Sequence, residues 1–294
     1  LPIEIVGSDL LRPVTYNENI GSAQVKSCII LSALNTPGVS VINSKISRNH
    51  TELMLKFLKY PIKVLKRNGY DKISVKGLNQ FKSFDYTVPS DISSASFFIV
   101  LTLLSENSKI LIENVNINQS RIGIISILNK MGAEIKLKNK KIYNGEAIAN
   151  IHVKSKKKLN AVNCPSKFNS SAIDEFLIIF LVAAKAKGIS YFKDISELNQ
   201  KESPRLNWGS KILNMMGIKT ILTKNSIKIY GQPNLKITKI ISIKNYLKDH
   251  RIFMMSVIAA LTLGGKWKIH DRDSINTSFP TFLSLIKDIS VKKK

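Results

Sequence analysis

The sequence predicts an α/β protein of two domains, built from copies of one repeated unit. The chain has 294 residues, of which 44% are hydrophobic, and this is more than one hydrophobic core usually supports. Four segments that begin with polar residues and continue as apolar, helix-like runs start about 70 to 80 residues apart. Each run is followed by a β-type stretch and a second, amphipathic helix, so helices and strands alternate along the chain.

The four apolar runs have hydrophobic residues on nearly every face, and we therefore expect them inside the domains. They are residues 22–31, 93–101, 172–180 and 249–257. Glycine follows three of the runs, at Gly38, Gly188 and Gly264. Because glycine is common at helix C-caps, we expect these three residues to end their helices.

Shorter elements fill the intervals between the apolar runs. The β-type stretches are residues 39–46, 109–117, 189–195 and 266–270, and the amphipathic helices are residues 49–58, 120–131, 203–216 and 278–289. Three copies end in a hairpin pattern, at residues 62–75, 133–143 and 218–230, and Asn68-Gly69 is a good turn signal in the first. The fourth copy has no hairpin, so we expect its closing strands to come from elsewhere in the protein.

A short polar stretch, residues 85–91, predicts the crossing between the two domains. We expect residues 1–89 to belong to one domain and residues 90–294, with three repeat units, to form the other. The first residue is Leu rather than Met, which suggests that the start of a longer protein is absent.

The formal charge of +25 raises the question of nucleic-acid binding. The lysines are nevertheless scattered over the predicted strands, and only residues 154–158 and 292–294 form clusters, without aromatic residues between them. We therefore expect small anions as partners, and no nucleic acid. The apolar runs are shorter than the roughly 20 residues that span a bilayer, and Cys28 and Cys164 lack metal-site spacing. A cytoplasmic protein without a metal or a disulfide is the simplest interpretation.

Polar residues stand at the beginnings of the apolar runs, where free helix N–H groups favour anions. Two of them, Asp174 and Glu175, are carboxylates in a segment that should be buried, which is costly unless they have partners or a task. Only seven of the 45 basic residues are arginine, and four of these occupy comparable places in the repeat. They are Arg48, Arg121, Arg205 and Arg251. The guanidinium group suits carboxylate or phosphate, although a salt bridge at a helix start would explain any single one.

The densest polar group in the sequence contains Lys201, Glu202 and Arg205. If it faces a cleft, partial burial could let Glu202 deliver a proton in spite of the two neighbouring cations. The alternative is a solvated loop before a helix, and the residues alone leave both interpretations open.

These motifs resemble those of the 3-phosphoshikimate 1-carboxyvinyltransferases, the EPSP synthase family. The matching strings are SAQVKS at residues 22–27, LNTPG at 34–38, SRNHTELML at 47–55, DISSASFF at 91–98, IDE at 173–175, KES at 201–203 with Arg205, DHR at 249–251 and TSFP at 277–280. They occur in family order across essentially the whole chain, so chance agreement is not credible.

The resemblance implies an enolpyruvyl transferase fold, in which two domains of repeated βαβαββ units close like a clamp. Residues 1–89 would then be the remainder of the N-terminal domain and residues 90–294 the C-terminal domain. The implied reaction transfers the enolpyruvyl group of phosphoenolpyruvate to the 5-hydroxyl of shikimate 3-phosphate and releases phosphate. This is a step of aromatic amino-acid biosynthesis that needs no cofactor or metal, and a cytoplasmic monomer is implied.

The resemblance also implies the roles of individual residues. Shikimate 3-phosphate would be bound by Ser22, Ala23, Gln24, Arg48, Asp174 and Lys201, and phosphoenolpyruvate by Gln24, Arg205 and Arg251. Asp174 would take the proton from the 5-hydroxyl, Glu202 would protonate the methylene of phosphoenolpyruvate, and Lys201 would stabilise charge nearby. Independently of the resemblance, we expect Glu175 to be structural, as a charge at a helix N-terminus.

Two departures from the family pattern concern the site. Pro204 and Asn49 stand where the family usually has Asp, and Pro204 removes a carboxylate that could orient Arg205. Because family residues that bind both substrates lie upstream of Leu1, we expect this chain alone to be inactive or nearly so. The alternatives are a catalytically silent binding or scaffold protein and a related transferase acting on UDP-N-acetylglucosamine.

Overall fold

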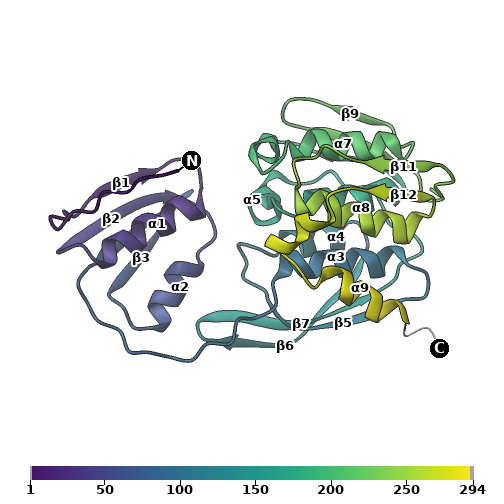
Figure 1. Ribbon diagram of the computed structural model, residues 1–294. Helices are drawn as coiled ribbons and strands as arrows, with labels where there is room; N and C mark the ends of the chain where they lie inside the picture. Colours follow the sequence, from purple (N-terminus) through teal and green to yellow (C-terminus); the bar gives the residue numbers. More distant parts are fainter. Residues whose placement is uncertain (1, 292–294) are drawn as a thin grey trace. The chain divides into compact units, whose positions relative to one another are not determined.

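The computed structural model describes residues 2–291, and the chain divides into two compact units (Figure 1). The first unit runs to Val88 and includes Lys141–Ala147, and the second contains Pro89–Lys140 and the chain from Ile148 onward. The lysine cluster at residues 292–294 lies outside the described residues.

The first unit contains one complete copy of the repeat, arranged as a four-stranded sheet with two helices. Its elements are β1 (Thr15–Glu18), α1 (Ala23–Leu34), β2 (Val39–Lys45), α2 (His50–Phe57), β3 (Ile62–Arg67) and β4 (Tyr70–Lys76). The strand order is β1-β2-β4-β3; β1 and β2 are parallel, and the other pairs are antiparallel. Ile42 and Ile73 face each other in the register and are fully buried with Ile30 of α1. The predicted hairpin turn at Asn68-Gly69 is confirmed, since β3 ends and β4 begins on either side of it.

The second unit contains three further copies. Its helices are α3 (Ile92–Leu104), α4 (Gly123–Lys130), α5 (Asn169–Ala172), α6 (Phe176–Lys185), α7 (Arg205–Met215), α8 (His250–Leu263) and α9 (Phe282–Val291), with 3-10 turns at Ser166–Phe168, Ser196–Gln200 and Arg272–Thr277. Its strands are β5 (Lys109–Asn116), β6 (Glu134–Tyr143), β7 (Glu146–Lys154), β8 (Gly188–Phe192), β9 (Thr220–Leu222), β10 (Ile227–Gly231), β11 (Ile240–Ile243) and β12 (Lys266–Ile269). The end of β6 and the start of β7 fall within Lys141–Ala147, which belongs to the first unit. They form three sheets in the orders β5-β7-β6, β8-β10-β9 and β11-β12.

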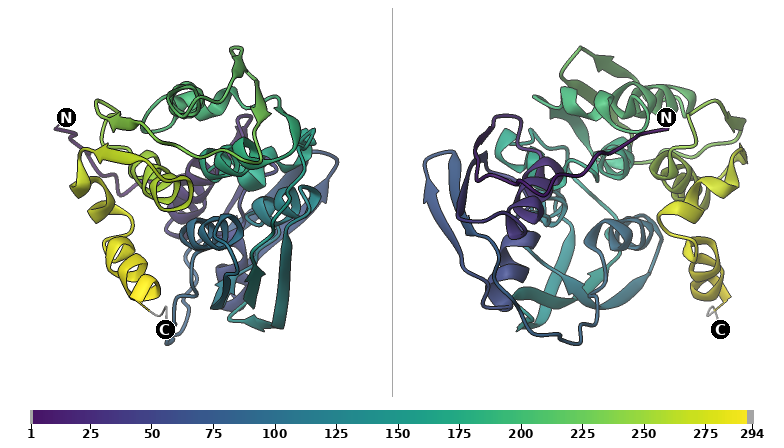
Figure 2. Two further views of the ribbon diagram at one scale, coloured as in Figure 1. Left: turned by 90° about the vertical axis from the view of Figure 1, so that its right-hand side faces the viewer. Right: turned by 60° about the vertical axis from the view of Figure 1, so that its left-hand side comes forward.

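The apolar helices form the core of the second unit, as predicted. Helices α3, α6 and α8 pack against one another in the middle of the unit (Figures 1 and 2). Every residue of α6 from Phe176 to Ala184 is buried. Burying an apolar helix on all faces contributes strongly to stability, at about 1.5–3 kcal/mol for each large apolar side chain, and this holds the helix N-termini in fixed positions.

The same parallel pairing introduces each copy of the repeat. In the first and fourth copies it is a pair of strands, β1 with β2 and β11 with β12. In the second and third copies it is reduced to isolated bridges, Ser90 with Val115 and Asn163 with Tyr191, plus Asn160 with Lys187. The apolar helix connects the two members of each pair, so the repeated element is a β-α-β unit.

Three details of the sequence prediction are wrong. Residues 133–143 form one strand, β6, and the chain turns at Asn144-Gly145 into β7, because β7 supplies the apolar partner that pairs with β5. Only Gly264 stands directly at a helix end; α1 ends at Leu34, where Asn35 closes the last turn. Gly38 and Gly188 instead enter strands with positive φ, +91° and +106°.

The third detail is the run at residues 172–180, which is not continuous. Helix α5 ends at Ala172 and α6 begins at Phe176, so residues 173–175 form a break between two helices. No helix among residues 2–291 combines the length and the apolar character that crossing a membrane requires.

Candidate active site

Asp174 lies in the break between α5 and α6, at the edge of the apolar core. The break is held by the buried residues of α6 that follow it and by the hydrogen bond from Glu175 N–H to Ala172 C=O, 2.9 Å. Asp174 keeps 13% of its side chain exposed, whereas Glu175 beside it is buried. The break therefore directs two consecutive carboxylates to different surroundings.

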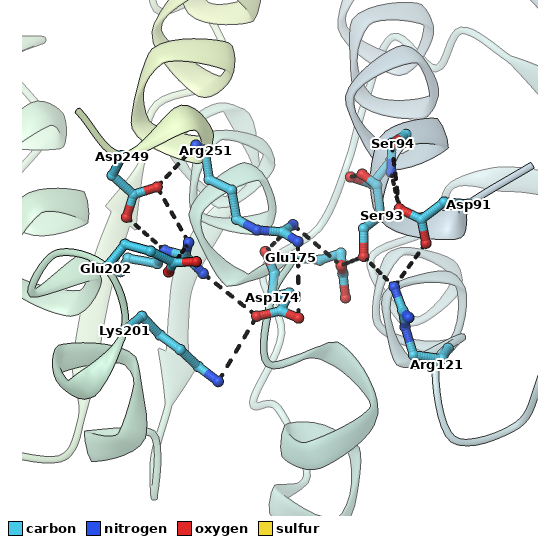
Figure 3. Close-up of polar contacts among 12 residues, drawn as sticks. Asp91, Ser93, Ser94, Arg121, Asp174, Glu175, Lys201, Glu202, Asp249 and Arg251 are labelled. Carbon is cyan, nitrogen blue, oxygen red and sulfur yellow. Dashed lines mark hydrogen bonds and ion pairs between the residues drawn. The ribbon is translucent and has the colours of Figure 1, made fainter. Parts of the chain in front are cut away.

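Three cations from separate elements lie near the Asp174 carboxylate. Figure 3 shows two of them, Lys201 and Arg251, on different sides of it. Lys201 Nζ lies 3.9 Å from Oδ1, Arg205 Nη1 3.5 Å from Oδ1, and Arg251 Nη2 3.9 Å from Oδ2. Lys201 also donates to Glu197, at 2.9 Å. The three positive charges stabilise a negative charge on Asp174, or on an anion bound beside it.

Arg205 begins α7, and its side chain is only 2% exposed. Its Nε donates to Asp249 Oδ2 at 2.8 Å, its Nη2 donates to Asp249 Oδ1 at 3.3 Å, and Nη2 also reaches Glu202 Oε2 at 2.5 Å. Glu202 is half-exposed and Asp249 is buried, so the same guanidinium group pairs with one accessible and one buried carboxylate. Pro204, whose C=O accepts from Trp208 N–H, adds no carboxylate, but Asp249 orients Arg205 in its place.

Asp249 is the buried centre of this arrangement. Its carboxylate accepts from Ser203 Oγ at 2.8 Å and from the backbone N–H of Arg251 at 2.9 Å, in addition to Arg205, and it thereby caps α8. Burial acts to raise the pKa of Asp249, but the hydrogen bonds from Arg205 and Ser203 outweigh it, so the pKa lies below its ordinary value. Asp249 therefore fixes the side chain of Arg205 and the backbone of Arg251 together.

A second buried carboxylate, Glu175, lies on the other side of Arg251. Arg251 Nη1 donates to the C=O of Asp174 at 2.9 Å and lies 3.6 Å from Glu175 Oε1. Glu175 Oε1 also accepts from Ser93 Oγ at 2.5 Å. Burial raises the pKa of Glu175, although Arg251 and the Ser93 hydroxyl act against that shift.

In the first unit, the residues expected to hold a phosphate group stand at the N-terminus of α1. Ser22 is the N-cap residue and accepts from Val25 N–H at 3.3 Å, while Ala23 and Gln24 form the first turn. Gln24 is exposed. Glu18, at the end of β1, accepts from the N–H groups of Ile20, Gly21 and Ser22 at 2.9–3.0 Å. Burial acts to raise the pKa of Glu18, but these backbone donors lower it overall, so a buried carboxylate shapes the loop before α1.

Arg48 is connected to α1 through a buried ion pair. Lys26 Nζ lies 2.7 Å from Glu52 Oε1 and donates to the C=O of Arg48 at 2.7 Å. Lys26 and Glu52 are 1% and 3% exposed, so this pair joins α1, α2 and the residues before α2 in the interior of the unit.

The structure therefore brings together five of the residues predicted from the sequence in one cluster of the second unit. The other four lie in the first unit, at or near the N-terminus of α1. The five are Asp174, Lys201, Glu202, Arg205 and Arg251, and the four are Ser22, Ala23, Gln24 and Arg48. Sequence reasoning placed Asp249 at a helix start but gave it no role in the site. One sequence signal could have identified Asp249. It begins the Asp-His-Arg string, which lies directly before an apolar run, and this is the position of a helix N-cap.

Comparison with solved structures places the fold among the enolpyruvyl transferases. The enolpyruvyl transferase NikO from Streptomyces tendae superimposes with a TM-score of 0.70 over 95% of this chain and 64% of its own, at 14% identity. That likeness defines the fold alone. The α/β fold class predicted from the sequence is confirmed.

The chain belongs to the EPSP synthase (3-phosphoshikimate 1-carboxyvinyltransferase) family, whose sequence model matches residues 1–286. EPSP synthase from Acinetobacter baumannii has a TM-score of 0.85 and 36% identity, with 95% of this chain and 62% of that one covered. The 3-phosphoshikimate 1-carboxyvinyltransferases of Ruthia magnifica and Caldicellulosiruptor bescii are 39% and 38% identical over 99% and 97% of the chain. The chain spans 65% of the length of each of these two relatives.

Proposed function

We propose that this chain is part of an enzyme that transfers the enolpyruvyl group of phosphoenolpyruvate to the 5-hydroxyl of shikimate 3-phosphate. Family membership supports the proposal, and so do the names of its relatives. The observation that carries it is the cluster in the second unit, where Asp174 lies within 4 Å of the guanidinium groups of Arg205 and Arg251, and Arg205 also pairs with a second acid, Glu202.

The reaction has two steps, addition and elimination. In the first, the 5-hydroxyl oxygen bonds to C2 of phosphoenolpyruvate, its proton goes to Asp174, and Glu202 gives a proton to C3. In the second, the C2–O bond to phosphate breaks, Asp174 gives its proton to the departing phosphate, and C3 gives a proton back to Glu202 as the double bond is restored, so both carboxyl groups return to their initial states. Arg205 and Arg251 are cations suited to the phosphate and carboxylate of phosphoenolpyruvate, and Lys201 stabilises charge that develops nearby.

The position of Glu202 supports its role as proton donor. Its carboxylate is half-exposed and contacts Arg205 Nη2, the cation proposed to bind phosphoenolpyruvate. A carboxyl group there would lie beside the bound substrate, where a proton donor to C3 is needed.

The remaining assignments concern the first unit and the whole protein. We propose that Ser22, Ala23, Gln24 and Arg48 bind shikimate 3-phosphate, with a free helix N-terminus favouring its phosphate. The unit up to residue 89 would be the remainder of an N-terminal domain, and residues 90–294 a C-terminal domain of three repeats. We expect a cytoplasmic monomer whose partners are the two small anionic substrates, and no nucleic acid.

Phosphate release from the two substrates, measured with the full-length gene product, tests the proposal. We expect turnover that depends on both substrates and a loss of about 10²–10⁴-fold in kcat for Asp174→Ala, with a far smaller effect on substrate binding. Asp273→Asn, an exposed carboxylate of the same unit, is the matched control and should leave kcat unchanged.

A well-folded full-length protein with no turnover would support the scaffold alternative instead. Turnover with UDP-N-acetylglucosamine and not with shikimate 3-phosphate would support the other alternative, a related transferase that acts on UDP-N-acetylglucosamine. A minor change in kcat for Asp174→Ala would remove its role as base.

A further inference from the structure

We propose that Glu175 is a positioning residue for Arg251 and that Ser93 and Arg121 hold it in place. The inference rests on the proposed function, because it takes Arg251 as a group that binds phosphoenolpyruvate. It concerns a buried carboxylate to which the proposed reaction assigns no step.

Glu175 and Asp174 fix the head of Arg251 from two directions. Nη1 donates to the Asp174 C=O at 2.9 Å and lies 3.6 Å from Glu175 Oε1, while Nη2 lies 3.9 Å from Asp174 Oδ2. A guanidinium group is planar, so acceptors on two sides restrict both its position and its rotation. Arg251 therefore presents the same edge beside Asp174 as long as Glu175 stays in place.

A directed chain of hydrogen bonds holds Glu175 (Figure 3). Arg121 Nη2 donates to Ser93 Oγ at 2.7 Å and to Asp91 Oδ1 at 2.8 Å. Because Ser93 Oγ accepts from Arg121, its own proton is directed onward to Glu175 Oε1, at 2.5 Å. The Glu175 carboxylate thus lies between two cations: Arg121, which acts through the Ser93 hydroxyl, and Arg251, which faces it directly. Charge-assisted hydrogen bonds of this kind are strong in a low-dielectric interior.

The contacts distinguish this role from simple helix capping. Glu175 stands at the N-cap position of α6, but its side chain makes no hydrogen bond to the first N–H groups of that helix. It reaches instead to α3, through Ser93, and to α8, through Arg251. Burial raises the pKa of Glu175, and Arg251 and the Ser93 hydroxyl act against that shift. The N-termini of the three core helices are thereby connected through one carboxylate.

The test compares two matched serine variants of α3 in the full-length protein. Ser93→Ala removes the hydroxyl that binds Glu175. Ser96→Ala removes an equally buried hydroxyl that donates to the Ser93 C=O at 2.6 Å and does not touch Glu175. Glu175→Gln keeps the shape of the side chain and removes its charge.

We expect Ser93→Ala and Glu175→Gln to raise KM for phosphoenolpyruvate on the order of tenfold to a hundredfold, the range for a charged hydrogen bond. KM for shikimate 3-phosphate and the fluorescence of the folded protein should stay unchanged, and Ser96→Ala should behave as wild type. Equal changes in both KM values, or none, would overturn the inference. If Glu175→Gln does not fold, the comparison of KM for phosphoenolpyruvate between Ser93→Ala and Ser96→Ala tests the inference.

A binding measurement separates this inference from the proposed function. Calorimetric titration with phosphoenolpyruvate and with inorganic phosphate requires no turnover. If the wild-type protein binds these anions without catalysing the transfer, the proposed function fails, and weaker binding by Ser93→Ala still upholds the positioning of Arg251. Wild-type protein that binds neither anion, or variants that bind as wild type does, would overturn the positioning role.

Discussion

Replacing Asp249 by Asn should destabilise the second unit strongly, although the change removes only one negative charge. Asp249 accepts four hydrogen bonds on two oxygens, from Ser203 Oγ, Arg205 Nε, Arg205 Nη2 and the Arg251 N–H. An Asn side chain has one acceptor oxygen, so two of these donors would lose their acceptor. Arg205, whose side chain is 2% exposed, would also lose its buried counter-charge.

The size of the effect follows from these contacts. Breaking a buried ion pair by removing one partner costs about 3–5 kcal/mol. Asp174 at 3.5 Å and Glu202 at 2.5 Å still face Arg205, so we expect a value near the lower limit, about 3 kcal/mol. With a urea dependence of about 1–3 kcal/mol per molar, the unfolding midpoint should fall by about 1 M or more.

Tryptophan fluorescence during urea unfolding of the 294-residue chain is a suitable assay, since both tryptophans, Trp208 and Trp267, lie in the second unit. Asp273→Asn is the matched control because Asp273 forms an exposed ion pair with Lys248. We expect no measurable shift of the midpoint for the control. A midpoint for Asp249→Asn no lower than that of the control would contradict the assignment of Asp249 as the residue that compensates Arg205.

The pH dependence gives a second comparison for the same variant. Burial acts to raise the pKa of Asp249, but the donors lower it overall, so its contribution to stability is fully present above the ordinary pKa of an unfolded Asp, about 3.9. This contribution is lost as the pH falls through the lower pKa of the folded state. The difference in unfolding free energy between wild type and Asp249→Asn should therefore shrink below about pH 4.

Three further predictions concern packing and reactivity. Lys26→Met should lower the stability of the first unit by about 3–5 kcal/mol, because Glu52 would remain buried without its cation; hydrogen exchange of α1 and α2 measures this, and wild-type protection would contradict it. Gly209→Ala should cost about 1–3 kcal/mol, because the new Cβ would lie 2.8 Å from a ring atom of α6; an unchanged urea midpoint would show that α6 and α7 can separate. Native protein should react with a thiol reagent at exposed Cys28 and not at Cys164, where burial raises the thiol pKa to about 11; mass spectrometry finding equal labelling of both would contradict the buried position.

The repeat, the fold class and the types of residue in the site could be predicted because they depend on local patterns. An apolar run such as residues 93–101 is expected to be buried whichever elements pack against it. Polar residues directly before such a run are expected at the N-terminus of the helix, independently of the tertiary structure. Arg205 and Arg251 were noticed for a similar reason, since arginine is rare in a chain that otherwise uses lysine. The hairpin at Asn68-Gly69 could be predicted because an Asn-Gly pair by itself favours the backbone angles of a tight β-turn.

The partners of these residues depend on contacts between distant parts of the chain. Ser93 meets Glu175 across 82 positions, and Arg205 meets Asp249 across 44. The break at residues 173–175 arises because packing of α6 among the core helices fixes where the helix restarts, which an apolar run cannot reveal. Charge and hydrogen bonding act over a few ångströms in space and disregard separation along the chain, so patterns in the sequence identify the charged groups, and packing alone selects which of them meet.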